Sequence, residues 1–373
     1  MIKYIQRFLS KCMFGVNRMG FRVMPIYPNA FETKAAVFED EREIYRASAK
    51  PDQIDILMAR TPEEEFSIRF GPLEKTMNVW LPEIDRVDAV IGLAVIPGIE
   101  RTGVYLLDDE FLKRAKFASR AGRVINQGVI MASRFASLLS SKIFAMVPFL
   151  ISEVDVLRRI SGAPGLIFGR MTHTVPIKNA LRVAADELGK SPREVSLVIA
   201  YLGENFSICA HSEGRVRDFT NAFERGPYSP WRSGGVPAAA IVRMAYSGMW
   251  SKIDLIRMAT FNSGVKGYTG TGDVDEIISR AESGNARSSL VLNAMVYQIA
   301  SEIAAQAAVL RGEVDAIVIT GDLAENNYLV NAIAERVSWI TKRIITFRGE
   351  DELLTMTRAA LRALKGEEAL RLA

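Results

Sequence analysis

Residues 200–234 read AYLGENFSICAHSEGRVRDFTNAFERGPYSPWRSG, and their pattern indicates the fold class. It begins within an apolar run, residues 195–202, whose length and composition predict a buried strand. Two further runs, residues 206–210 and 215–219, flank Ser212-Glu213-Gly214, in which the glycine can adopt the positive φ of a tight turn. The pattern predicts a strand that leads into a hairpin.

A similar pattern occurs near the start of the chain. Residues 23–36 and 37–39 are predicted to form the two arms of a hairpin, because apolar runs flank the turn-forming Pro28 and Asn29. Strands and helices are then expected to alternate. The expected strands are 88–93, 144–151, 314–321 and 343–347, and the expected helices are 109–116, 121–139, 175–188, 288–310, 328–337 and 352–365. Two successive halves that each begin with a hairpin predict an internally duplicated, two-lobed α/β fold.

Size and composition are those of a folded globular protein. The 373 residues are enough for two domains, with 49% apolar and 24% charged residues. The formal charge of +4 is small and its basic residues are interspersed with acids, so nucleic acid is not implied as a partner. Cys12 and Cys209 are far apart, which fits a reducing cytoplasm, and two histidines, His173 and His211, exclude a multi-histidine metal centre.

Residues 1–22 differ from the rest because they contain five basic residues and no acid. Lys3, Arg7 and Lys11 repeat at helical spacing, and the apolar residues fall on the opposite side, which predicts a basic amphipathic helix. Such a helix can lie on an anionic membrane or dock in a groove. The alternatives are a frayed terminal helix, or translation that starts at Met19 or Met24.

Several motifs, in order along the chain, resemble the butyrate kinase family. They are KAAVFED (34–40), RISG (159–162), GPYSP (226–230), RSG (232–234), MVYQIA (295–300) and GEDEL (349–353). The resemblance extends from about Val23 to Glu368 and includes the related acetate kinases. It implies a duplicated, two-domain actin-like fold of the acetate and sugar kinase type, with a cleft between the lobes.

The resemblance also implies a domain division and a reaction. Residues 23–150 with 354–373 would form the N-terminal lobe, and residues 151–353 the nucleotide-side lobe. The family transfers the γ-phosphoryl group of ATP, with Mg²⁺, to a short-chain carboxylate and so forms an acyl phosphate. A homodimer paired through the second domain is expected on the same grounds.

Site residues follow from the matching positions. Those implied as catalytic are Arg232, His173 and Glu352, with Glu352 also expected to hold the metal; those implied as cofactor-binding are Lys34, Gly203, Asn205, Gly321 and Asp322. The strand-glycine-helix junction at residues 320–324 also suits phosphate on general grounds, because free N–H groups and the helix dipole favour anions.

Each of these residues has a structural alternative. Arg232 can form a salt bridge between the lobes, His173 can cap a helix or pack, and Glu352 can simply begin the last helix. Lys34 can point to solvent, and the turn at Gly321 can merely reverse the chain. His211, beside a hairpin turn, is interpreted as structural.

The chain also departs from the family pattern at positions expected to face phosphate. In the opening loop, the resemblance expects small residues and hydroxyls where Tyr27, Asn29, Ala30 and Glu32 stand. Further along, Leu93 replaces an arginine, Val147 an aspartate and Glu204 a glycine; Asn205 and Asp322 also replace glycines. An arginine on a transferring phosphate contributes about 10³-fold or more in rate, so ordinary turnover is not expected.

Three functional hypotheses follow. The first is a butyrate-kinase-like protein whose phosphoryl transfer is lost or strongly impaired and which acts as a binding or regulatory homologue. The second is an active, divergent acyl kinase that has rebuilt its phosphate contacts. The third is a scaffold subunit tethered to a membrane through residues 1–22.

Overall fold

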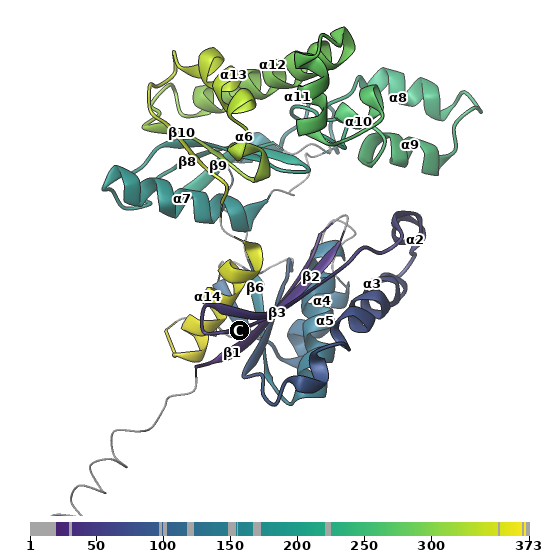
Figure 1. The fold of residues 1–373 in the computed structure, drawn as a ribbon, viewed down its shortest axis with the longest axis vertical. Coiled ribbons are helices and arrows are strands. Elements are labelled where there is room, and N and C mark those ends of the chain that lie inside the picture. Colours follow the sequence, from purple (N-terminus) through teal and green to yellow (C-terminus); the bar gives the residue numbers. More distant parts are fainter. Residues whose placement is uncertain are drawn as a thin grey trace, which may run out of the picture.

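The computed structural model describes residues 20–29, 32–96, 99, 103–117, 123–147, 154, 156–166, 173–220, 225–349, 351–367 and 369–370. These residues form two sheets, each with its own helices, and Figure 1 shows them as two bodies joined end to end. We call the body with the seven-stranded sheet the N-terminal lobe and the body with the five-stranded sheet the C-terminal lobe. The predicted N-terminal helix lies almost entirely outside the described residues.

The N-terminal lobe has strand order β12-β5-β6-β4-β1-β2-β3. The bounds are β1 Arg22–Pro28, β2 Thr33–Glu39, β3 Arg42–Ala49, β4 Ala89–Leu93, β5 Gly103–Leu106, β6 Lys142–Val147 and β12 Ala369–Leu370. Met24 and Ile26 point to one face, which α3 (Pro62–Met77) and α5 (Arg123–Leu139) cover, while Val23 points to the other, which α14 (Glu352–Leu364) covers. The remaining helical segments are α2 (Gln53–Met58), η1 (Leu81–Glu83) and α4 (Asp109–Phe117).

The C-terminal lobe has strand order β11-β10-β7-β8-β9. The bounds are β7 Leu197–Leu202, β8 Phe206–Ser212, β9 Arg215–Phe219, β10 Ala316–Thr320 and β11 Ile344–Phe347. Its two faces are covered by α12 (Ala286–Val309) with α13 (Asn327–Val337), and by α7 (Thr174–Leu188). Its other helical segments are α6 (Val156–Arg159), α8 (Ala238–Ala245), α9 (Lys252–Thr260), α10 (Gly264–Thr269), α11 (Val274–Glu282) and η4 (Asp322–Glu325).

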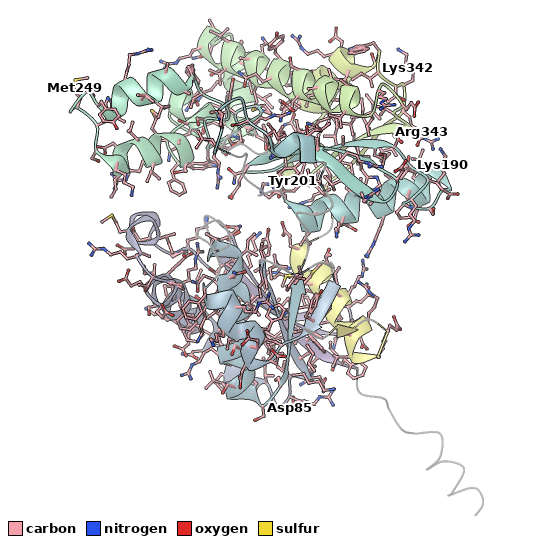
Figure 2. The ribbon with its side chains drawn as sticks, turned by 180° about the vertical axis from the view of Figure 1, so that it is seen from behind. Asp85, Lys190, Tyr201, Met249, Lys342 and Arg343 are labelled. Carbon is pink, nitrogen blue, oxygen red and sulfur yellow. The ribbon has the colours of Figure 1, made fainter. Side chains whose placement is uncertain are left out.

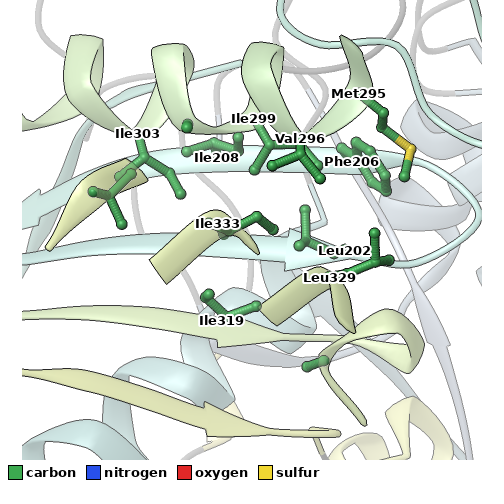
Figure 3. Close-up of a cluster of buried hydrophobic side chains, with 14 of the residues drawn as sticks. Leu202, Phe206, Ile208, Met295, Val296, Ile299, Ile303, Ile319, Leu329 and Ile333 are labelled. Atoms are coloured by element: carbon green, nitrogen blue, oxygen red, sulfur yellow. The ribbon is translucent and has the colours of Figure 1, made fainter. Parts of the chain in front are cut away.

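The core between α12, α13 and the sheet is entirely apolar at its centre. Figure 3 shows side chains of α12 and α13 meeting those of three strands: Met295, Val296, Ile299, Ile303, Leu329, Ile333, Leu202, Phe206, Ile208 and Ile319. Asn285 caps α12 by accepting a hydrogen bond from the Ser288 amide, 2.9 Å away. This core fixes the end of β7, where the candidate site lies.

The two sheets repeat one topology. The order β3-β2-β1-β4-β6 matches β9-β8-β7-β10-β11, and in each the hairpin strands pair antiparallel while the next two strands join in parallel. The predicted duplicated, two-lobed α/β fold is therefore confirmed. The proposed domain boundaries stay a prediction, although α14 packs on the N-terminal lobe as that division requires. None of the described helices has the length and apolar composition needed to cross a membrane.

Two features of the first three strands differ from expectation. The first hairpin arm ends at Pro28 and the second begins at Thr33, so the predicted division at residues 36 and 37 is wrong. Runs of apolar residues continue on both sides of the turn, so the sequence does not reveal where the turn lies. The strand β3 was not predicted, because its exposed outer residues make REIYRASA look like a polar loop.

One close backbone approach positions the end of β4. An ideal Cβ on Gly92 would lie 2.3 Å from the carbonyl carbon of Gly128 in α5. Helix and strand can therefore touch only because Gly92 has no side chain. We expect Gly92→Ala to lower the free energy of unfolding by about 1–3 kcal/mol, in a urea titration.

The matched control is Gly162→Ala, because nothing lies within 4 Å of the Cβ it would add. Equal stability of the two variants would contradict the close approach.

Candidate functional site

The carboxyl ends of β7 and β10 lie side by side, with Tyr201 paired to Thr320. Ligands of open α/β sheets bind beyond the carboxyl ends of parallel strands. The turn after β7 contains Gly203 and Asn205, and the segment after β10 begins with Gly321 and Asp322. Four residues predicted to bind the cofactor are thus brought to one edge of the C-terminal lobe.

Gly321 is required by packing. Its φ is +100°, and an ideal Cβ would lie 2.5 Å from the carbonyl oxygen of Leu202. Its amide donates a hydrogen bond to the carbonyl oxygen of Arg348 at 3.0 Å, so that N–H is already used within the protein. The interpretation of this junction as a chain reversal therefore has direct support, whereas its role toward phosphate stays a prediction.

His173 and Tyr201 form an aromatic wall at this edge. Their ring centroids lie 4.5 Å apart, and Nδ1 of His173 is 2.8 Å from Oγ of Ser207. Burial, assisted by the positive charge of Arg232, lowers the pKa of His173 to about 3. The imidazole is therefore neutral at physiological pH. In Figure 2, Tyr201 lies on the side of the C-terminal lobe that faces the N-terminal lobe.

Arg232 is held inside a short turn. Its amide donates to Oγ of Ser229 at 3.2 Å, and its carbonyl accepts from the Ser229 amide at 3.1 Å. The residue is only 7% exposed. Burial lowers the pKa of Arg232 to about 10, an effect that the carboxylate of Glu204 opposes. Arg232 therefore keeps its charge at neutral pH, with Glu204 as a nearby countercharge.

In the N-terminal lobe, the predicted site residue Lys34 is part of an ion pair. Nζ of Lys34 lies 3.1 Å from Oε1 of Glu32, whose other oxygen accepts a hydrogen bond from Ser48 at 2.6 Å. Burial raises the pKa of Glu32, but the Ser48 hydrogen bond and Lys34 outweigh it, so that the pKa is lowered overall. Lys34 is only partly exposed, so the alternative in which it points freely to solvent is wrong.

Glu352 is the first residue of α14, which Asp351 caps. Burial raises its pKa, although Lys34 acts in the opposite direction. The position suits either predicted role, a metal ligand or a helix-start carboxylate. Among the residues that the structure describes, no three His, Cys, Asp or Glu side chains are grouped as a metal would require.

The two lobes meet where Val175 of α7 packs in one apolar cluster with α14, the helix that Glu352 begins. The pKa of Tyr27 on β1 is well above its usual value, because of burial first and then the charges of Glu352, Tyr201 and Glu204. Burial also raises the pKa of Glu204, and the neighbouring Glu32 adds to this. Residues from both lobes therefore share one electrostatic environment.

Asn205 and Asp322 differ in exposure. Asn205 is 9% exposed, and its Oδ1 has no hydrogen-bond partner among the described residues. Asp322 is largely exposed and lies 3.6 Å from Nε of Arg348. The added carboxylate at Asp322 is therefore partly balanced by a cation from the adjacent strand end.

Two of the departures from the family pattern lie in apolar cores. Leu93, at the end of β4, is 4% exposed and packs with Val23, Ile91 and α14 residues. Val147, at the end of β6, is 2% exposed and packs in a separate cluster near Tyr105 and Phe111. Neither side chain can donate to or accept from a ligand.

Sequence reasoning missed three supporting residues. Ser207 holds His173, Ser48 holds Glu32, and Arg46 of β3 binds Asp351 at 2.5 Å. Ser207 follows the turn by two residues and was within reach of a sequence argument. Ser48 and Arg46 were not, since both lie on the strand that the sequence did not predict.

The fold defines the class of protein. The structure superposes on acetate kinase of Porphyromonas gingivalis with a TM-score of 0.70 at 14% identity, covering 91% of this chain and 99% of that one. It superposes on a propionate kinase of Francisella tularensis with a TM-score of 0.72 at 16% identity, covering 91% and 98%. This is the duplicated, two-domain α/β arrangement of the actin-like ATPase fold.

The sequence defines the family. The chain is 30% identical to butyrate kinase 1 of Clostridium acetobutylicum over 349 residues, which is 93% of this chain and 98% of the relative. It is also 30% identical to a probable butyrate kinase of Listeria monocytogenes over 351 residues, or 94% and 99%. Residues 172–342 match the acetokinase family model. The chain belongs to the acetokinase family, whose members are ATP-dependent kinases of short-chain carboxylates.

Several described groups predicted to bind phosphate at this edge already have partners within the protein. Phosphate binding needs free N–H donors and unpaired cations. Here the Gly321 amide is used by Arg348, and Lys34 is paired with Glu32. Glu204 adds negative charge at the turn after β7. Of the residues that the structure describes at this edge, Arg232 is the one best suited to hold an anion.

The half-buried, neutral His173 predicts a pH dependence of stability. The folded state keeps it neutral down to about pH 3, whereas in the unfolded chain its pKa is near 6.5, so unfolding takes up a proton between these values. Stability should therefore fall as the pH falls through this window. Below pH 6, the free energy of unfolding of the wild type should fall relative to that of His173→Gln, by about 1.4 kcal/mol for each pH unit.

Urea titrations of both proteins at several pH values measure this difference. His211, which burial also shifts downward in pKa, is present in both and cancels. Parallel pH profiles would contradict the assignment of a neutral, half-buried imidazole.

Proposed function

We propose that this protein is a butyrate-kinase-like homologue in which phosphoryl transfer from ATP to a carboxylate is lost or strongly impaired, and that it serves a binding or regulatory role. One observation carries the proposal. Leu93 and Val147 stand where the resemblance implies an arginine and an aspartate, and both are buried in apolar clusters. Local repacking cannot turn either side chain into a charged contact.

The electrostatics of the lobe junction support the same proposal. Lys34 is neutralised by Glu32, and Glu204 places a carboxylate near Arg232. Transfer of a phosphoryl group needs cations that neutralise charge on the equatorial oxygens. The charges at this junction already compensate one another, so little cationic field is left for a ligand.

The alternative is an active, divergent acyl kinase. Arg232, His173 and Glu352 favour it, because all three lie at the junction and Arg232 keeps its charge there. In that case Arg232 would hold the anionic substrate, and Glu352 would help to hold the Mg²⁺ that screens phosphate charge. The two functions differ in whether the wild-type protein binds and uses ATP.

We expect the purified protein to form acyl phosphate from ATP and butyrate at least about 10³-fold more slowly than a functional butyrate kinase. A hydroxamate assay, with butyrate kinase 1 of Clostridium acetobutylicum as the control, measures this. Melting temperatures with millimolar Mg·ATP give a second readout, because a ligand that binds the native state raises the melting temperature. Ordinary turnover, or a clear rise with ATP, would favour the active kinase.

We further propose that the protein is a homodimer and that α8 and α9 form its interface. No residue of α8 is buried, and Val242, Tyr246 and Met249 are 57%, 88% and 80% exposed. Figure 1 shows α8 and α9 projecting from the C-terminal lobe, and Figure 2 places Met249 at their outer end. Residues 236–250 contain one charged side chain, Arg243, which suits the charge-poor centre of a homodimer interface.

We expect Tyr246→Ser with Met249→Ser to convert a dimer into a monomer, measured by light scattering after size-exclusion chromatography. The apolar area of these side chains would be the source of association. The matched control is Trp339→Ser, since Trp339 is 72% exposed on a different part of the lobe. A wild-type monomer, or a dimer that survives the double substitution, would contradict the interface.

A cytoplasmic location is proposed from cysteine usage. Cys209 is free and fully buried, and burial raises the pKa of its thiol to about 12, so it is unreactive. Membrane contact through residues 1–22 also stays a proposal. Loss of binding to anionic vesicles when these residues are removed would support it, and unchanged binding would contradict it.

A further inference from the structure

The side chain of Tyr201 covers the turn that follows β7. An ideal Cβ on Gly203 would lie 2.8 Å from the Tyr201 hydroxyl oxygen and 3.1 Å from Cζ. The end of the tyrosine ring therefore occupies the space directly above the backbone of Gly203. Anything that approaches this backbone, at the ligand-binding edge of the sheet, meets the ring first.

Tyr201 is fixed in this position. It packs against the core cluster beneath α7, and its ring contacts that of His173, which Ser207 holds in turn. Rotating the ring away would break these contacts and expose apolar surface. The ring therefore acts as a permanent part of the wall, and its position does not depend on a bound molecule.

Glu204 adds a charge barrier to this steric one. Its side chain is exposed at the tip of the same turn, but its carboxyl group is partly desolvated; this desolvation, with the nearby carboxylates of Glu32 and Asp322, raises its pKa. A polyanion that approached the backbone of this turn would be repelled by the carboxylate of Glu204, which directly follows Gly203.

We propose that Tyr201 and Glu204 are the specificity-determining residues that exclude nucleoside triphosphates from this turn. The inference rests on the proposed function, because it explains which residues prevent ATP from binding. It goes further in one respect, since it predicts that substituting these two residues restores ATP binding. The scaffold of the C-terminal lobe would accept Mg·ATP once the ring and the carboxylate are replaced.

The test uses three variants of the full-length chain: Glu204→Gln, Tyr201→His, and the two combined. Glu204→Gln removes only the charge, at an exposed position, and should fold like the wild type. Tyr201→His shortens the side chain and keeps an aromatic ring beside His173. The matched control combines Tyr297→His with Glu335→Gln, at exposed positions on α12 and α13.

Binding is measured by isothermal titration with Mg·ATP and, separately, with adenosine. We expect the double variant to bind Mg·ATP at least about tenfold more tightly than the wild type, with an intermediate gain for Glu204→Gln that shrinks at high salt. Adenosine, which lacks phosphates, should show no comparable gain. The control variant should behave like the wild type with both ligands.

The outcomes separate the two proposals. If the wild type already binds Mg·ATP tightly, the proposed loss of function is wrong. If it does not, and folded Glu204→Gln and double variants show no gain, the exclusion role of Tyr201 and Glu204 is wrong while the proposed function stands. An equal gain for adenosine would also refute the inference, because it would indicate general loosening of the lobe.

Discussion

Charged side chains that are buried where the two lobes meet must be paired or neutral, and the candidate site follows from this constraint. Removing an unpaired charge from water costs several kcal/mol or more. Lys34 is accordingly paired with Glu32, and His173 is held neutral. A cation that the protein has already neutralised cannot serve an incoming anion, so the pair that stabilises the junction also opposes phosphate binding.

The scaffold does not depend on these side chains. It depends on two close contacts of the backbone. Gly92 approaches Gly128 in the N-terminal lobe, and Gly321 approaches Leu202 in the C-terminal lobe. They fix the ends of β4 and β10 whichever groups stand beside them. Membership of the acetokinase family is therefore evidence for an architecture, whereas the reaction has to be argued from the residues at the site.

The sequence predicted what local patterns determine. The apolar runs that became β7, β10 and β4 were recognisable, and so were the helices whose apolar residues recur at helical spacing. It did not predict β3, whose outer face is exposed, or the projecting pair α8 and α9, which has little core of its own. At the site, the gathering of Arg232, His173 and Glu352 could be expected from the resemblance. The partner of Lys34 and the position of the Tyr201 ring could not, because both result from tertiary contacts.

The apolar replacements and the retained arginine have opposite energetic consequences. Replacing a buried charged group with a well-packed apolar one is often neutral or stabilising, so Leu93 and Val147 can persist without cost to the fold. Arg232 is different, because a cation that is only 7% exposed needs a countercharge. In a phosphate-binding site the ligand supplies that charge. In this protein the carboxylate of Glu204 also favours the charged form of Arg232, so the chain itself meets part of the need that a bound anion would otherwise meet.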